Sequence, residues 1–244
     1  MNVLKAIYKR EINSYFKTPI AYVFIVIFIF LNGVFTFKLA NFYEANQADL
    51  RSFFLWHPWI YLFLVPAISM RFWSEERKSG TIELLFTLPV KPKTAIIAKF
   101  LAAWTFIFIN LLLTFPMVIT VNYLGSPDNG VILVSYFGSF LMAGGYLSIG
   151  SAFSSITKNQ IISFIVTAVA CLTLILIGFA PFIKFFSGIL PDFIIEQLRA
   201  ISFIAHFDSL QKGVIDFRDI IFFVSIIFCG LYATFIILEE KKSE

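Results

Sequence analysis

The chain has 244 residues, of which 59% are hydrophobic and 14% charged, with a mean hydropathy of +0.86 and a formal net charge of +4. Soluble domains carry roughly 25% charged residues, so this composition excludes an ordinary large soluble domain and indicates a membrane protein. The basic residues flank apolar runs and form no separate face or arm, which argues against nucleic acid as a partner. We therefore expect an all-α membrane protein with a single transmembrane domain over residues 1–244.

Residues 1–17 have a helical period with one apolar and one polar side. The apolar stripe consists of Leu4, Ile7, Tyr8, Ile12, Tyr15 and Phe16. The opposite side carries Lys5, Lys9, Arg10, Asn13 and Lys17, and Glu11 follows Arg10. This pattern predicts an interfacial amphipathic helix that lies flat on a membrane surface. The apolar core and small-residue cleavage site of a signal peptide are missing, so we expect this segment to remain on the mature protein.

Six apolar runs are each close to or above the roughly 20 residues that cross a bilayer. We predict transmembrane helices at residues 20–39, 53–72, 94–121, 131–156, 161–180 and 219–238. Pro66 is expected to kink the second span. Lys99, near the start of the third span, is expected to reach back towards the lipid headgroups. His57 and His206 lie at the predicted outer ends of spans and are interpreted as interfacial or hydrogen-bonding residues.

The fourth run has small residues at intervals of four, a pattern that lets helices approach closely. These are Gly144, Ser148 and Ala152, with Gly138, Gly145, Gly150 and Ser151 beside them. The pattern leaves open whether the face meets another helix of this chain or a second copy.

Residues 71–93, RFWSEERKSGTIELLFTLPVKPK, separate the second and third spans with a dense cluster of charge. A charged side chain at the bilayer centre costs about 3 kcal/mol, so this hairpin is expected in water or among headgroups. Gly80 and Pro89 bracket residues 81–88, about two helical turns, with Glu83 near the positive end of the helix dipole. We predict a short surface helix there.

Residues 181–218 are too charged to cross the membrane and too apolar for a free loop. Pro181 and Pro191 interrupt them, and Lys184, Glu196 and Arg199 are among their charged residues. We expect one or two short helices at the outer interface.

The distribution of basic residues predicts the orientation. Thirteen of the nineteen Lys and Arg residues fall on the side of the termini and the hairpin, and six fall on the other side. Positive charge is enriched in cytoplasmic segments, so the N- and C-termini and the hairpin are predicted to be cytoplasmic.

No arrangement of side chains in the sequence supports catalysis, a metal site or a disulfide. Cys171 and Cys229 lie within apolar runs and are interpreted as small hydrophobic residues. There is no glycine-rich phosphate loop ending in Gly-Lys-Ser or Gly-Lys-Thr, so any ATP must be bound by another protein. Ionisable residues are missing from the predicted span centres, which argues against an ion-coupled transporter.

The hairpin resembles the cytoplasmic motif of ABC-2 type permeases. An acidic-basic pair, Gly-Thr, a Glu, a Leu pair and Pro occur here as Glu75-Glu76-Arg77-Lys78-Ser79-Gly80-Thr81-Ile82-Glu83-Leu84-Leu85 followed by Leu88-Pro89. The amphipathic N-terminal helix with Arg10-Glu11 and the six spans also match, so the resemblance covers the whole chain. The stretch from His206-Phe207-Asp208 through Gly213 and Asp216 to Asp219 is similar to the subgroup associated with gliding motility and nitrous-oxide-reductase maturation.

The resemblance implies that residues 81–88 form the coupling helix, which docks into a groove on a separate ATPase subunit. Leu84, Leu85 and Phe86 would be apolar anchors, Glu75, Glu76, Arg77 and Glu83 charge partners, and Gly80 would permit a tight entry. It further implies an exporter in the bacterial cytoplasmic (inner) membrane, with two ATPase copies that hold ATP and Mg²⁺. The second permease would be the same chain or a paralogue.

Two other functions fit the same sequence features. The subunit could transmit force to an envelope partner through residues 181–218 without transporting anything. It could also be an ATP-independent membrane scaffold or assembly factor. An intramembrane enzyme has the least support, because no pair of residues has a plausible catalytic spacing.

Overall fold

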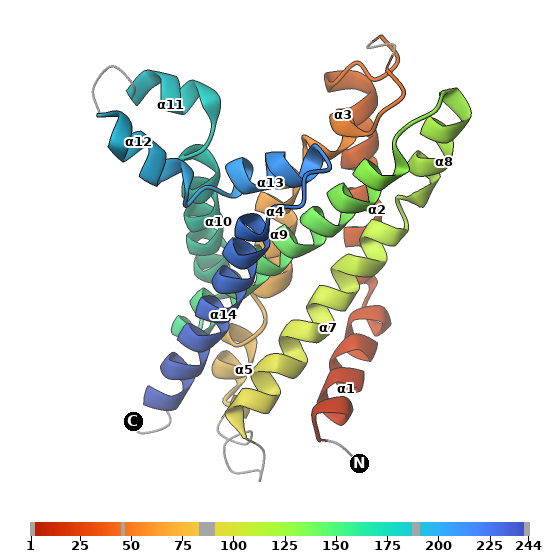
Figure 1. Ribbon diagram of the computed structural model, residues 1–244. Coiled ribbons are helices and arrows are strands. Elements are labelled where there is room, and N and C mark those ends of the chain that lie inside the picture. Colours follow the sequence, from red (N-terminus) through yellow and green to blue (C-terminus); the bar gives the residue numbers. More distant parts are fainter. Residues whose placement is uncertain (1–2, 45–46, 83–90, 187–190, 242–244) are drawn as a thin grey trace.

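The computed structural model describes residues 3–44, 47–82, 91–186 and 191–241. All regular secondary structure in these ranges is helical, and the first and last described residues lie at the same end of the bundle (Figure 1). The helices are α1 (Val3–Lys17), α2 (Pro19–Val34) with the π-helix η1 (Phe35–Leu39), α3 (Arg51–Phe54), α4 (His57–Ser69), α5 (Ser74–Ser79), α7 (Pro92–Leu112), α8 (Phe115–Leu124), α9 (Asn129–Ile156), α10 (Gln160–Leu176), α11 (Ala180–Phe186), α12 (Asp192–Arg199), α13 (Phe203–Gln211) and α14 (Phe217–Glu240). The predicted all-α class is confirmed.

Within the described ranges, five helical segments are long and apolar enough to cross a membrane. They are Pro19–Leu39, Arg51–Ser79, Pro92–Leu124, Asn129–Ile156 and Phe217–Glu240. α10 and α11 are apolar enough together but are bent by 70°. The structure therefore has five candidate spans, or six if this bent pair forms one crossing, compared with the six that we predicted.

Polar side chains cap several helices, and prolines begin others. Asp128 accepts from the N–H groups of Gly130 and Val131 at the start of α9. Asn159 does the same for α10. α2 and α7 start with proline, which lacks the N–H that the first helical turn leaves unpaired. Most of the predicted spans thus begin close to a capping side chain or a proline.

The third and fifth spans are less regular than the sequence suggested. In the third, α7 ends at Leu112 and α8 starts at Phe115. At this break the Thr114 hydroxyl donates to the Leu111 carbonyl at 2.6 Å. In the fifth, a Cβ on Gly178 would lie 1.8 Å from Ser202 Oγ. Only glycine therefore lets α10 end against the start of α13.

The outer segment differs from the prediction in number and in burial. Its described residues, 181–186 and 191–218, contain three short helices, α11, α12 and α13, where one or two were expected. α13 is part of the core, since Phe203, Phe207 and Leu210 are at most 2% exposed. Built Cβ atoms on Gly138 and Gly145 of α9 would lie 2.8 Å from Leu210 and Phe203. These glycines on α9 therefore make room for α13.

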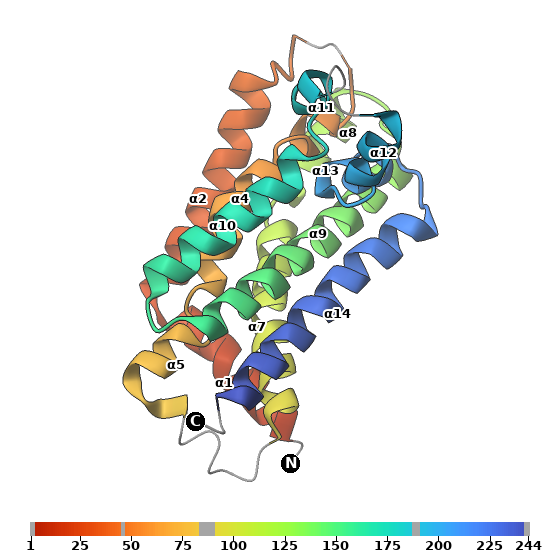
Figure 2. The same ribbon diagram turned by 90° about the vertical axis from the view of Figure 1, so that its left-hand side faces the viewer.

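α9 is the central helix and packs against α4, α7, α10, α13 and α14. Figure 2 shows it between α10 and α14. Its small residues serve helices of this chain, which answers the question left open by the sequence. Gly144 lies against Trp104 and Ile227, Gly150 against Ser69, and Ser148 against Gly230 of α14.

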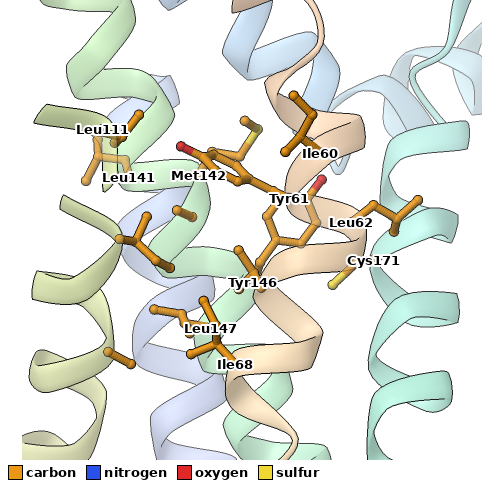
Figure 3. Packing of buried hydrophobic residues seen from close by; sticks show 14 of the residues in the cluster. Ile60, Tyr61, Leu62, Ile68, Leu111, Leu141, Met142, Tyr146, Leu147 and Cys171 are labelled. Carbon is orange, nitrogen blue, oxygen red and sulfur yellow. The ribbon is translucent and has the colours of Figure 1, made fainter. Parts of the chain in front are cut away.

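The centre of the core lies between α4 and α9. Figure 3 shows Tyr61 of α4 with Met142 and Tyr146 of α9, and Cys171 of α10 beside them. All four side chains are at most 1% exposed. Tyr146 stacks on Phe203 with ring centroids 4.9 Å apart, which ties α13 to this cluster.

His57 is buried and makes a hydrogen bond, which is one of the two roles expected for it. Its Nδ1 lies 2.7 Å from Ser139 Oγ, which also lies 2.7 Å from the Tyr61 hydroxyl. The rings of Phe53 and Phe54 lie 4.7 and 5.1 Å from the imidazole. α3, which carries these two rings, therefore covers the imidazole at the start of α4.

The contact between Gly230 and Ser148 predicts a sharp steric effect. A Cβ on Gly230 would lie 2.7 Å from the carbonyl carbon, the Cβ and the Oγ of Ser148. We expect Gly230→Ala to destabilise the protein by about 1–3 kcal/mol through overpacking. Gly33→Ala is the matched control, because its Cβ would meet nothing within 4 Å. Thermal unfolding midpoints in one detergent test this, and equal midpoints for the two variants would contradict it.

Candidate functional site

The charged segment after α4 forms a helix of its own, α5, which the sequence analysis missed. Glu75 and Glu76 lie in its first turn and Arg77 and Lys78 in its last, the arrangement that suits a helix dipole. Gly80 ends it with φ +73°, a left-handed conformation that favours glycine. Gly80 was expected to bracket residues 81–88; it terminates α5, and Thr81 and Ile82 directly after it are helical. We call residues 72–80 the α5 junction.

Ser154 of α9 holds the start of the α5 junction. Its Oγ accepts from the N–H groups of Trp73 at 3.1 Å and Ser74 at 3.2 Å. The same hydroxyl donates to the Met70 carbonyl at 3.0 Å. These are backbone groups that the end of one helix and the start of the next leave unpaired. One buried serine therefore joins α9 to the corner between α4 and α5.

Arg77 joins the other end of α5 to the end of α9. Its Nη1 donates to the carbonyls of Ser155 at 2.8 Å and Ile156 at 2.6 Å. The Lys241 ammonium, after α14, also donates to Ile156 at 2.8 Å. Cations at the last carbonyls of a helix are favoured by the helix dipole. The ends of α5, α9 and α14 consequently meet at Ile156.

Lys99 of α7 points to the α5 junction, where protein groups surround its ammonium; that it reaches the depth of the headgroups stays a prediction. Its Nζ lies 2.6 Å from Glu76 Oε1 and 2.7 Å from the Phe72 carbonyl oxygen. It also lies 4.8 Å from the centre of the Trp73 ring. The side chain is only 8% exposed, so these partners replace water around the ammonium.

The N-terminal helix lies along α7 beside the junction. The Tyr8 hydroxyl donates to Thr105 Oγ1 at 3.0 Å, and the Tyr15 ring stacks on Phe106 at 5.4 Å. Ile7 and Ile12 are partly buried against the core, whereas Arg10 pairs with Glu11 at 2.6 Å. Burial raises the pKa of the Tyr15 phenol well above its usual value of 10, and the Glu11 carboxylate adds to the rise. The amphipathic pattern thus predicts the packed face; the position on a membrane surface stays a prediction.

The structure describes only part of the predicted coupling segment. Thr81 and Ile82 continue in helical conformation, and Thr81 Oγ1 lies 2.9 Å from Ser79 Oγ. Five of the predicted docking residues lie outside the described residues: Glu83, Leu84, Leu85, Phe86 and Pro89. Glu76 and Arg77 were expected to contact an ATPase, and in this structure they contact α7 and α9.

At the opposite end, the predicted outer residues gather where α13 meets α14. His206 Nδ1 lies 2.6 Å from Asp219 Oδ1 and Nε2 lies 3.0 Å from the Ala200 carbonyl oxygen. The imidazole also stacks on Phe222 at 4.0 Å. Asp216 caps α14, Gly213 has φ +79°, and Asp208 pairs with Lys212. Phe207 is buried beneath them at 2% exposure.

The described ranges contain no group of three His, Cys, Asp or Glu side chains that could hold a metal ion. Both cysteines are free, with Cys171 buried and Cys229 exposed. What distinguishes the α5 junction is that a charged segment is bonded directly to α7 and to the ends of α4 and α9.

Residues 5–238 match the family described as ABC-2 family transporter protein. None of the curated proteins compared with the chain matches it. The family match spans α1, both sides of the α5 junction and almost all of α14.

Proposed function

Because the chain belongs to the ABC-2 family of transporter proteins, we propose that it is the permease subunit of an ATP-driven exporter whose ATPase is a separate protein. In this proposal ATP and Mg²⁺ are bound by the partner, and this chain performs no chemistry of its own. It receives the movement of the ATPase and changes the arrangement of its membrane helices.

The observation that carries the proposal is the bonding of the α5 junction, immediately before residues 81–88. Ser154 and Arg77 join this junction to α9 and Lys99 joins it to α7, so α5 cannot shift without stretching bonds to these two helices. An ATPase that displaces residues 81–88 would pass its movement through α5 to these helices. A solvated loop would lack such bonds and would absorb the displacement.

The proposed assembly contains two ATPase copies and two permeases, the second being the same chain or a paralogue. It lies in a bacterial cytoplasmic membrane, with both termini and the α5 junction on the cytoplasmic side, as the positive-inside rule favours. The closing stretch around His206 and Asp219 favours the gliding-motility and nitrous-oxide-reductase-maturation subgroup.

A second candidate, transmission of force to an envelope partner, is favoured by the position of α13. Its Phe203 ring stacks on Tyr146 of α9, and its Gln211 side chain donates to the Arg51 carbonyl at 2.8 Å. α9 therefore contacts the α5 junction at one end and α13 towards the other. Movement received at residues 81–88 could reach the outer segment without any substrate.

Photo-crosslinking tests the proposed docking side. A photo-reactive residue at Lys78, exposed on α5, is expected to crosslink to an ATPase in native membranes. The same residue at Lys212, exposed at the opposite end, is the matched control and is expected to give no such product. The purified complex should hydrolyse ATP faster than the ATPase alone.

Three results would separate the alternatives. Complete absence of an ATPase adduct at Lys78 would leave the ATP-independent scaffold as the better function. An ATPase adduct at Lys212 would reverse the proposed orientation. Stimulated ATP hydrolysis without flux of any substrate, together with an envelope protein crosslinked at Lys212, would favour transmission of force.

A further inference from the structure

A cavity of about 490 Å³ lies beside the α5 junction, and neither the family nor the proposed coupling accounts for it. Its walls come from α1, α2, α4, α7 and the α5 junction. The elements contribute the end of α1, the start of α2 and the end of α4, so the cavity lies beside the corner between α4 and α5. We place this corner at the depth of the lipid headgroups, because its charged side chains would be costly in the hydrocarbon core.

The lining is amphiphilic. The apolar part of the lining includes Ile20, Ala21, Phe24, Ile68 and Phe106. The ionisable side chains in the lining are Glu11, Arg71, Glu75, Glu76 and Lys99. A volume of this size is typical of small-molecule sites, which combine apolar surface with a few polar groups that set orientation. The occupant that such a wall suits has a charged head and an apolar body.

The ion pairs already present determine which charges remain for a ligand. Lys99 is paired with Glu76, and Glu11 is paired with Arg10. Arg71 and Glu75 are both exposed and form no ion pair within the part of the chain that the structure describes. One guanidinium and one carboxylate are therefore available, which matches a head carrying one negative and one positive charge.

The remaining groups also favour one kind of zwitterion. A guanidinium binds phosphate through paired N–H donors, which assigns Arg71 to a phosphodiester. A carboxylate binds a primary ammonium through N–H donors that a quaternary ammonium lacks, which assigns Glu75 to the amine. Glu76 Oε2, on the same wall, has no hydrogen-bond partner among the described residues, so an acceptor is in excess there. Carboxylates outnumber cations in the lining by three to two, which disfavours a lipid with net negative charge.

We propose that this cavity binds the headgroup of a phosphoethanolamine lipid, with Arg71 on the phosphate and Glu75 on the ammonium. The acyl chains leave along the apolar wall formed by α2 and α4. Such a lipid contacts both α1 and the α5 junction, since both line the cavity. The site is a property of the permease chain alone and does not depend on the proposed ATPase.

Native mass spectrometry of the purified chain tests the site. The protein is equilibrated in detergent with equal amounts of phosphatidylethanolamine, phosphatidylcholine and phosphatidylglycerol. We expect about one phosphatidylethanolamine retained per chain, and retention at least fivefold lower in Arg71→Gln and in Glu75→Gln. Arg218→Gln and Glu196→Gln are matched controls, exposed at the other end of the bundle, and should retain the lipid as the unaltered chain does.

Soluble glycerophosphoethanolamine completes the test, because it has the head without the apolar body and is expected to bind much more weakly. The proposal is overturned by any of three results. The first is equal lipid retention in the Arg71 and Glu75 variants and in their controls. The second is retention of phosphatidylcholine or phosphatidylglycerol as strong as that of phosphatidylethanolamine. The third is binding of the soluble compound as tight as that of the lipid.

Discussion

Replacing Glu83 with Lys and Leu84 with Ala is expected to abolish the stimulation of ATP hydrolysis while leaving membrane insertion intact. The double variant removes an apolar anchor and reverses a charge on the proposed docking helix. Buried anchors at protein interfaces contribute about 2 kcal/mol or more each, and a misplaced charge adds to that loss. A combined loss of about 3–4 kcal/mol weakens docking by a factor of a few hundred. ATP hydrolysis should then fall to the rate of the isolated ATPase.

The measurement is ATP hydrolysis in vesicles reconstituted with the ATPase and either permease variant. A matched control carries the same chemical changes at the other end of the bundle, as Glu196→Lys with Leu198→Ala on α12. This control should retain full stimulation. Unchanged stimulation in the Glu83 and Leu84 variant would show that residues 81–88 do not form the docking helix.

Apolar runs predicted the all-helical class and most of the candidate spans, because a membrane requires length and hydrophobicity, and both can be read from a sequence. The irregularities of the third and fifth spans could not be predicted from the sequence. The break at Thr114 depends on a hydroxyl that bonds a carbonyl, and the bend after α10 depends on Ser202 approaching Gly178. Both are contacts that only the tertiary structure defines.

The α5 junction shows the same limit at the candidate site. The sequence identified the charged residues, but it assigned Glu76 and Arg77 to a partner protein. Their observed partners, Lys99 and the end of α9, are separated from them by more than twenty residues of sequence. One signal was available, since acidic residues followed by basic ones over a single short stretch before glycine fit a capped helix. That pattern predicts α5, although it cannot predict what α5 touches.

The largest stability effect is expected from breaking the ion pair between Lys99 and Glu76. Lys99→Met leaves the Glu76 carboxylate partly buried without a cation, which we expect to cost about 2–4 kcal/mol. Glu76→Met leaves the ammonium with the Phe72 carbonyl and the Trp73 ring, so its cost should be smaller. The double variant Lys99→Met with Glu76→Met replaces both charges by apolar groups of similar length. It should recover most of the lost stability, because no buried charge remains unpaired.

Thermal unfolding of the four proteins in one detergent gives the coupling between the two residues as a double-mutant cycle. The exposed pair Asp208 and Lys212 provides the control, since both side chains are about half exposed. Water screens such a pair, so its cycle should give a coupling below about 1 kcal/mol. If the Lys99 and Glu76 changes instead prove additive, the pair contributes no more than a surface contact. Helix α5 would then be held mainly by Ser154 and Arg77, and the bond from Lys99 to the Phe72 carbonyl would be the remaining polar link between the α5 junction and α7.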